Sequence, residues 1–114
     1  MDKETTVHEL KRLVSDFRDE RGWKKYNTPK NLAVSISIEA AELLEQFRWK
    51  NDEEASRMVR DVDKRNEVSD ELADVMIYCL GLSDTLNIDV AEAVKRKLEK
   101  NRRKYPALKA EVTA

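Results

Sequence analysis

Four acidic residues are spaced so that two pairs of carboxylates can act together. Glu39 and Glu42 are three positions apart, and after 28 intervening residues Glu71 and Asp74 repeat this spacing. Residues three apart on an α-helix are neighbours on one face. Carboxylate oxygens suit hard ions, whereas zinc prefers Cys or His, of which the chain has one each. The spacing therefore predicts a site for Mg²⁺, with Mn²⁺ as a substitute.

Both acid pairs fall on helix faces that must pack. At about 100° per residue, Glu39 projects into the apolar stripe of its helix and Glu42 lies on its margin. Glu71 falls inside the stripe of a later helix, with Asp74 at its edge. Two carboxylates about 5 Å apart repel by roughly 3 kcal/mol at an effective dielectric near 20, so they need protons or cations between them. The stripes are Leu32, Ile36, Leu43 and Phe47, and Val75, Tyr78, Cys79, Leu82 and Leu86.

A different interpretation of the acids stays open at this point. Glu39 and Glu71 can instead pair with Lys or Arg side chains of neighbouring helices. The chain would then be a non-catalytic helical adaptor or oligomerisation module. Spacing alone does not separate this reading from a metal site, since Glu-x-x-Glu is common in charged helices.

A basic run near the end of the chain offers contacts for phosphate. Lys97 and Asn101 lie one helical turn apart and can donate to a polyphosphate. Cations near a helix C-terminus are also favoured by the helix dipole alone. Nucleic-acid binding is the weaker interpretation, because the net charge is −1 and the run occupies one end only. The run consists of Lys95, Arg96, Lys97, Lys100, Arg102, Arg103 and Lys104.

Three aromatic residues, Trp23, Trp49 and Tyr78, are candidates for a nucleobase pocket. An aromatic ring can stack on any base, because every base offers a π face. Trp49 follows the first acid pair, and Tyr78 follows Asp74 by one turn. The alternative is packing at a subunit interface, where Trp and Tyr are enriched.

The composition favours an all-α protein. The 114 residues are 39% charged and 6% aromatic, with two Gly and two Pro, too few turn and aromatic residues for a sheet protein. One Cys excludes a disulfide framework, and no apolar run reaches the ~20 residues that a membrane helix needs. The chain opens without a secretory leader, so we expect a cytoplasmic protein that does not enter a membrane.

Apolar periodicity predicts four long helices and one short one. Thr6, Thr28 (followed by Pro29) and Asp89 are expected N-caps, and Gly22 and Asn87 are expected breaks. We expect one domain over residues 1–106, followed by a short tail over 107–114. The expected helices span residues 6–21, 29–49, 54–59, 64–86 and 90–104.

The amphipathic helices and short connections predict an antiparallel four-helix bundle. The apolar stripes are narrow, and Phe47, Trp49, Leu80 and Leu82 give apolar surface in several directions. We therefore expect a homodimer or homotetramer that completes the core by symmetric pairing. The alternative is a monomeric bundle with ordinary surface leucines.

The order of these residues resembles the E-x-x-E…E-x-x-D pattern of the MazG-like family of all-α nucleoside triphosphate pyrophosphohydrolases, nearest its dCTP pyrophosphatase branch. The likeness extends from about Phe17 to Pro106. It rests on the stretches WKKYNTPKNL (23–32), EAAELLEQFRW (39–49), ELADVMIY (71–78) and KNRRKYP (100–106).

The resemblance implies Mg²⁺-dependent hydrolysis of a nucleoside triphosphate to a monophosphate and pyrophosphate, with a role in nucleotide-pool sanitation and a pyrimidine such as dCTP as substrate. By position, Glu39, Glu42, Glu71 and Asp74 are similar to the family's metal ligands. Trp23, Trp49 and Tyr78 look like its base-pocket aromatics, and Lys97 and Asn101 like its triphosphate contacts. Val14 and Asn27 stand where some members have His, which affects the preferred base and leaves the metal site intact.

Overall fold

The computed structural model describes residues 1–108, and this range contains helices and no strand. The all-α prediction is confirmed. Residues 109–114 of the expected tail lie outside the described residues. The elements are α1 (Val7–Glu20), the short 3₁₀ helix η1 (Lys24–Tyr26), α2 (Pro29–Glu45), α3 (Asp52–Met58), α4 (Val62–Thr85) and α5 (Val90–Lys104).

The predicted helix starts are confirmed by their capping bonds. Thr6, Thr28 and Asp89 each accept a hydrogen bond from the backbone N–H three residues later, at 3.1, 3.2 and 2.8 Å. Pro29 occupies the first position of α2, where its missing N–H leaves no partner unsatisfied.

The predicted breaks at Gly22 and Asn87 are also confirmed. Both residues have a left-handed backbone, with φ of 64° and 57°. At each end, the N–H of the following residue returns to the carbonyl five positions earlier, at 3.0 and 2.8 Å. These are Schellman closures, which satisfy the last carbonyls of α1 and α4.

Three details of the expected helices were wrong. α2 ends at Glu45, one turn before Trp49, because the backbone hydrogen bonds that follow join residues three apart. The chain then enters α3 through a capping box at Asn51. Asp61 caps α4, so this helix begins slightly earlier than predicted. Cys79 and Leu86 are exposed, because the buried part of α4 instead includes Leu80, Gly81 and Ser83.

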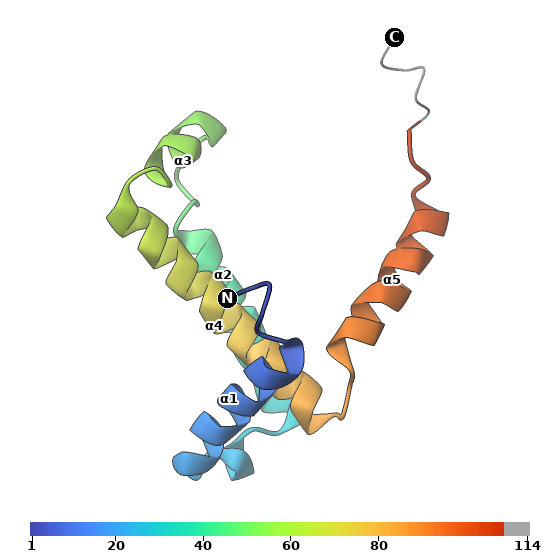
Figure 1. The fold of residues 1–114 in the computed structure, drawn as a ribbon. Helices are drawn as coiled ribbons and strands as arrows, with labels where there is room; N and C mark the ends of the chain where they lie inside the picture. The colour runs from blue at the N-terminus through green and yellow to red at the C-terminus, as the bar shows by residue number, and fades with distance from the viewer. Residues whose placement is uncertain (109–114) are drawn as a thin grey trace.

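α4 is the central helix of the molecule (Figure 1). It lies along α2 and contacts α1. The three helices meet at Gly81, where an added Cβ would lie 3.8 Å from Leu32 Cδ2 and 3.9 Å from Val14 Cγ1. Since the start of α2 meets the end of α4, these two helices are antiparallel. Leu32 and Leu80 are the buried apolar side chains among residues 1–108.

The chain is far more open than a compact protein of its size. Its radius of gyration is 17.7 Å, against about 13 Å for a globular chain of this length. Its accessible surface is 9591 Å², against about 6,400 Å² for a folded monomer of this mass. Figure 1 shows α5 standing apart from α2 and α4, so one copy does not form a four-helix bundle. The bundle and the oligomer therefore stay predictions.

Within the described range, every helix is too short or too polar to cross a lipid bilayer.

Candidate metal and nucleotide site

Three of the four predicted metal ligands come together between α2 and α4. One carboxylate oxygen from each of Glu39, Glu42 and Glu71 lies within 4.8 Å of the other two. Asp74 does not belong to this set of mutually close oxygens. Its charge nevertheless contributes to raising the pKa of both Glu39 and Glu71, so it acts on the same site. The three close residues are called the acid cluster below.

The acid cluster contains carboxylate oxygens that are buried without a partner. Oε2 of Glu39 and Oε2 of Glu71 are removed from solvent, and neither accepts a hydrogen bond from the residues that the structure describes. Burial is the main cause that raises the pKa of both carboxyls above the ordinary value. A nearby Glu42 carboxylate raises both further. Such a site favours an added positive charge, because a buried carboxylate without a partner is costly.

Within residues 1–108, these acids do not form interhelical salt bridges. None of the ion pairs among residues 1–108 includes Glu39, Glu42, Glu71 or Asp74. Oε2 of Glu39 and Oε2 of Glu71 therefore have lone pairs that no residue of the described range uses. A set of close carboxylate oxygens with unused lone pairs fits a hard divalent cation such as Mg²⁺ or Mn²⁺.

The antiparallel packing of α2 and α4 separates the three candidate base-pocket aromatics. Trp23 precedes α2, and Tyr78 follows Asp74 on α4, so both belong to the end of the pair that meets α1. Trp23 also packs edge-on against Phe17, with ring centroids 5.7 Å apart. Trp49 follows α2 and lies beyond the acid cluster at the opposite end, where it is 78% exposed. Within one chain, Trp49 therefore does not share a pocket with Trp23.

Lys97 and Asn101 lie on α5, which is separate from α2 and α4 in Figure 1. The chain fixes the start of α5 through the ammonium of Lys11, which donates to the carbonyl of Ile88. Beyond that point the helix turns away from the acid cluster. A single copy thus does not bring these two predicted phosphate contacts to the acids.

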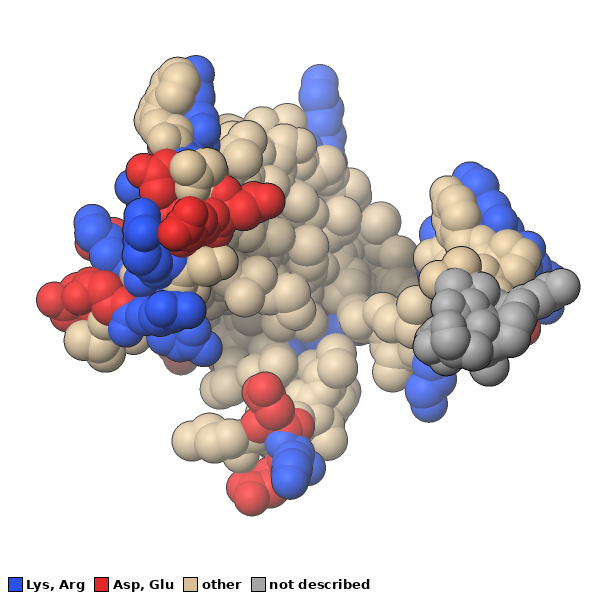
Figure 2. All heavy atoms as spheres, turned by 90° about the horizontal axis from the view of Figure 1, so that it is seen from above, with Lys and Arg blue, Asp and Glu red and all other residues tan. Residues whose placement is uncertain are grey.

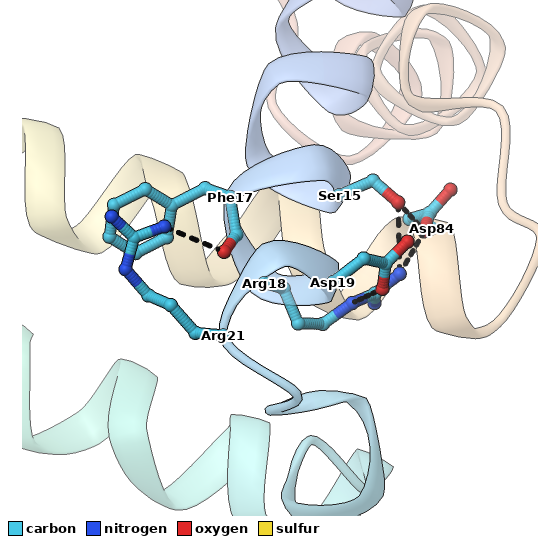
Figure 3. A network of polar contacts seen from close by, with 6 residues as sticks. All are labelled: Ser15, Phe17, Arg18, Asp19, Arg21 and Asp84. Carbon is cyan, nitrogen blue, oxygen red and sulfur yellow. Dashed lines mark hydrogen bonds and ion pairs between the residues drawn. The ribbon is translucent and has the colours of Figure 1, made fainter.

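A buried polar network between α1 and α4 was missed from the sequence (Figure 3). The guanidinium of Arg18, whose side chain is 9% exposed, donates to Ser15 Oγ at 2.9 Å and to Asp84 Oδ2 at 3.3 Å. It also donates to Asp19 Oδ1 at 3.3 Å. The available signal was spacing: Arg18 follows Val14 by four residues and Asp84 follows Leu80 by four, so each continues a packing face. The network fixes α1 on α4, and with it the Trp23 end of the site.

The chain is similar to known proteins in both sequence and structure. A model described as the MazG-like family matches residues 34–113. The chain is 36% identical over 104 residues to dCTP pyrophosphatase 1 of Homo sapiens, covering 91% of this chain and 61% of that protein. It is also 36% identical over 103 residues to dCTP pyrophosphatase 1 of Bos taurus, covering 90% and 61%. The chain thus spans about three fifths of the length of these curated relatives.

A solved structure matches over nearly its whole length. The crystal structure of a pyrophosphatase from Archaeoglobus fulgidus superposes with a TM-score of 0.81 at 54% sequence identity, covering 88% of this chain and 92% of that one. The family match extends over more than half of the residues, and the acid cluster lies within it. The chain therefore belongs to the MazG-like family.

Proposed function

We propose that this protein hydrolyses nucleoside triphosphates to monophosphate and pyrophosphate with a divalent cation, Mg²⁺ or Mn²⁺, as cofactor. The acid cluster carries this proposal, because its buried oxygens without partners are suited to a cation. The activities named for the relatives support the reaction and favour a pyrimidine such as dCTP as substrate. A role in nucleotide-pool sanitation and a cytoplasmic location stay predictions.

The side chains divide the work along the α2/α4 pair. Glu39, Glu42 and Glu71, with Asp74 beside them, would hold the cation. A bound Mg²⁺ would neutralise phosphate charge and polarise the phosphoryl group that water attacks. Stacking on the base falls to the aromatics Trp23, Tyr78 and Trp49. Lys97 and Asn101 would donate to the triphosphate and offset charge on the leaving pyrophosphate.

The proposed enzyme works as a homodimer or homotetramer in which α5 of one copy serves another. Lys97, Asn101 and Trp49 are all remote from the Trp23 end of their own site, and a second copy can supply them. The surface of the chain supports this arrangement. An apolar groove of about 690 Å³ between α1 and α4 is lined by side chains such as Leu13, Leu72 and Met76, which are 64%, 51% and 50% exposed. Large apolar side chains that are exposed together in one groove favour an interaction site.

A phosphate-release assay tests the reaction. The eight common NTPs and dNTPs are incubated with the protein and Mg²⁺, inorganic pyrophosphatase is added, and phosphate is measured with malachite green. We expect Mg²⁺-dependent release that requires the added pyrophosphatase, with dCTP among the best substrates. No release from any nucleotide would refute the proposed function, and release without added pyrophosphatase would mean that another bond is cut.

The assembly is tested by light scattering after size-exclusion chromatography. We expect two or four copies for the natural chain. Leu13→Glu with Met76→Glu places two charges in the apolar groove, and we expect it to yield smaller species. Leu108→Glu, an exposed change outside the groove, is the control. A natural chain that elutes as a monomer would contradict the shared site.

A further inference from the structure

The two ends of the α2/α4 pair differ in chemistry, and the acid cluster lies between them. At the α1 end, Trp23, Phe17 and Tyr78 provide aromatic surface. At the other end, α3 closes over the end of α2 and the start of α4. Figure 2 shows basic and acidic side chains crowded at this α3 end, while the centre of the same face is uncharged. Apolar and charged parts of one extended ligand would therefore prefer opposite ends.

A polar cavity of about 420 Å³ lies at the α3 end. Three cationic side chains from three different segments line it: Lys50 from the α2–α3 connection, Arg57 from α3 and Lys64 from the first turn of α4. Two carboxylates, of Glu45 and Glu54, also reach the cavity. Its lining carries one more positive than negative charge.

Only Glu54 is bound in the capping box, whereas Glu45, Arg57 and Lys64 take part in weak, exposed ion pairs. Glu54 accepts the backbone N–H of Asn51 at 3.0 Å in the capping box, and Glu45 accepts from Arg48 at 3.5 Å.

The cations of the cavity can turn to a ligand. Arg57 and Lys64 each pair with an acid on their own helix at 3.4 Å, and both side chains are more than half exposed. Exposed pairs of this kind contribute about 0–1 kcal/mol, so they exchange readily for a phosphate. Lys50 takes part in no ion pair within residues 1–108.

The cavity is next to the acid cluster along both helices. Glu45 is one turn, about 5 Å, beyond Glu42 on α2, and Lys64 is two turns, about 10 Å, before Glu71 on α4. A triphosphate whose first phosphate lies at the acid cluster can extend its remaining phosphates toward these cations. The nucleoside then points the other way, toward Trp23 and Tyr78.

We infer that the cavity formed by Lys50, Arg57 and Lys64 binds the two terminal phosphates of the substrate and the pyrophosphate that leaves, beside the Lys97 and Asn101 that another copy would supply. This inference rests on the proposed function and gives the substrate one direction along the α2/α4 pair. Hydrolysis breaks the bond between the first and second phosphates, water supplies an oxygen to the monophosphate, and pyrophosphate remains in the cavity until it dissociates.

Product inhibition tests this direction, because the two products would occupy different ends. We compare inhibition by pyrophosphate and by the nucleoside monophosphate in the natural chain and in a Lys50→Gln/Arg57→Gln double variant. The expected result is at least about a tenfold rise in the inhibition constant for pyrophosphate, with inhibition by the monophosphate unchanged. Arg60→Gln, an exposed change next to α3 that does not line the cavity, is the matched control.

Titration calorimetry with pyrophosphate at fixed Mg²⁺ provides a second readout that does not depend on turnover. We expect weaker binding by the double variant and tighter binding by Glu45→Gln, which removes a negative charge from the cavity. Equal pyrophosphate affinity in the natural chain and the double variant overturns the inference, as does an equal loss for both products. If the natural chain is active, the proposed function stands whichever of these results is found. If the natural chain shows no turnover, the proposed function is refuted, and calorimetry still tests whether the cavity binds pyrophosphate.

Discussion

α4 has buried charged side chains at two helix contacts. At one contact the charges are paired within the chain, and at the other they are not. Where it meets α1, the buried guanidinium of Arg18 donates to Ser15 and Asp84 and no buried donor is left over (Figure 3). Where it meets α2, buried oxygens of Glu39 and Glu71 have no partner within residues 1–108. Charges that serve only to join helices are thus neutralised inside the chain, because an unpaired buried charge destabilises the fold. Charges left unpaired mark the place where something from outside is expected.

Glu71→Gln is the most direct test of the contact between α2 and α4, where the buried carboxylates are unpaired. The amide keeps the shape of the side chain and removes its charge, so we expect turnover to fall at least about 100-fold, with the far-ultraviolet circular dichroism unchanged. Asp63→Asn, on the same helix and exposed, is the control and should keep full activity. Turnover within a few-fold of the natural chain would remove Glu71 from the site.

Mg²⁺ should stabilise the α2/α4 region by binding the folded state. At 100 times its Kd, a ligand of this kind adds about 2.7 kcal/mol to the free energy of unfolding. We therefore expect Tm in a thermal melt to rise with Mg²⁺ beyond the change produced by Na⁺ at equal ionic strength. Glu39→Gln should lose most of this rise. A rise of the same size in both chains would mean that the ion binds elsewhere.

Arg18→Met tests the contact between α1 and α4, where the buried charge is paired. It removes the guanidinium that donates to Ser15 and Asp84, so that Asp84 keeps only the Ser15 hydroxyl as a donor. We expect the free energy of unfolding in urea to fall by about 1–3 kcal/mol. The double variant Arg18→Met/Asp84→Leu replaces the charge pair by apolar groups and should recover part of the loss. Neither change touches the acid cluster, so Mg²⁺ should still raise Tm in both variants. Unaltered stability in Arg18→Met would show that the network is dispensable.

Without metal, the contribution of the acid cluster to the free energy of unfolding should depend on pH. Burial and like charge raise the pKa of Glu39 and Glu71 in the folded chain above the ordinary 4.5. As pH rises above 4.5, the unfolded chain loses these protons first, so the contribution of both groups to the free energy of unfolding falls until their folded pKa values are passed. In EDTA, Glu39→Gln should therefore gain stability relative to the natural chain as pH rises toward neutrality. Parallel pH profiles from urea melts would contradict this.

The sequence was most informative where the physics is local. Capping by Thr6, Thr28 and Asp89 and the left-handed ends at Gly22 and Asn87 depend on a few neighbouring atoms, so the helix ends could be read directly. The placement of the acids on packing faces also followed, since it needs only the 100° helical step.

What could not be predicted depends on contacts between distant segments. The direction of α5 follows from one closure at Asn87 and from Lys11, 77 positions from its acceptor. The separation of Trp49 from Trp23 follows from the antiparallel course of α2 and α4. Arg18 and Asp84 are 66 positions apart, and neither residue alone reveals that it is buried with the other.

Leu32 and Leu80 are the enclosed apolar side chains of residues 1–108, which is little for a chain of this length. In the proposed oligomer, most of the hydrophobic stabilisation available to the sequence is gained where copies cover one another. Folding and association would then form a single equilibrium rather than two successive steps. We therefore expect the midpoint of denaturation to move upward with protein concentration, and a dilute sample to unfold and dissociate together.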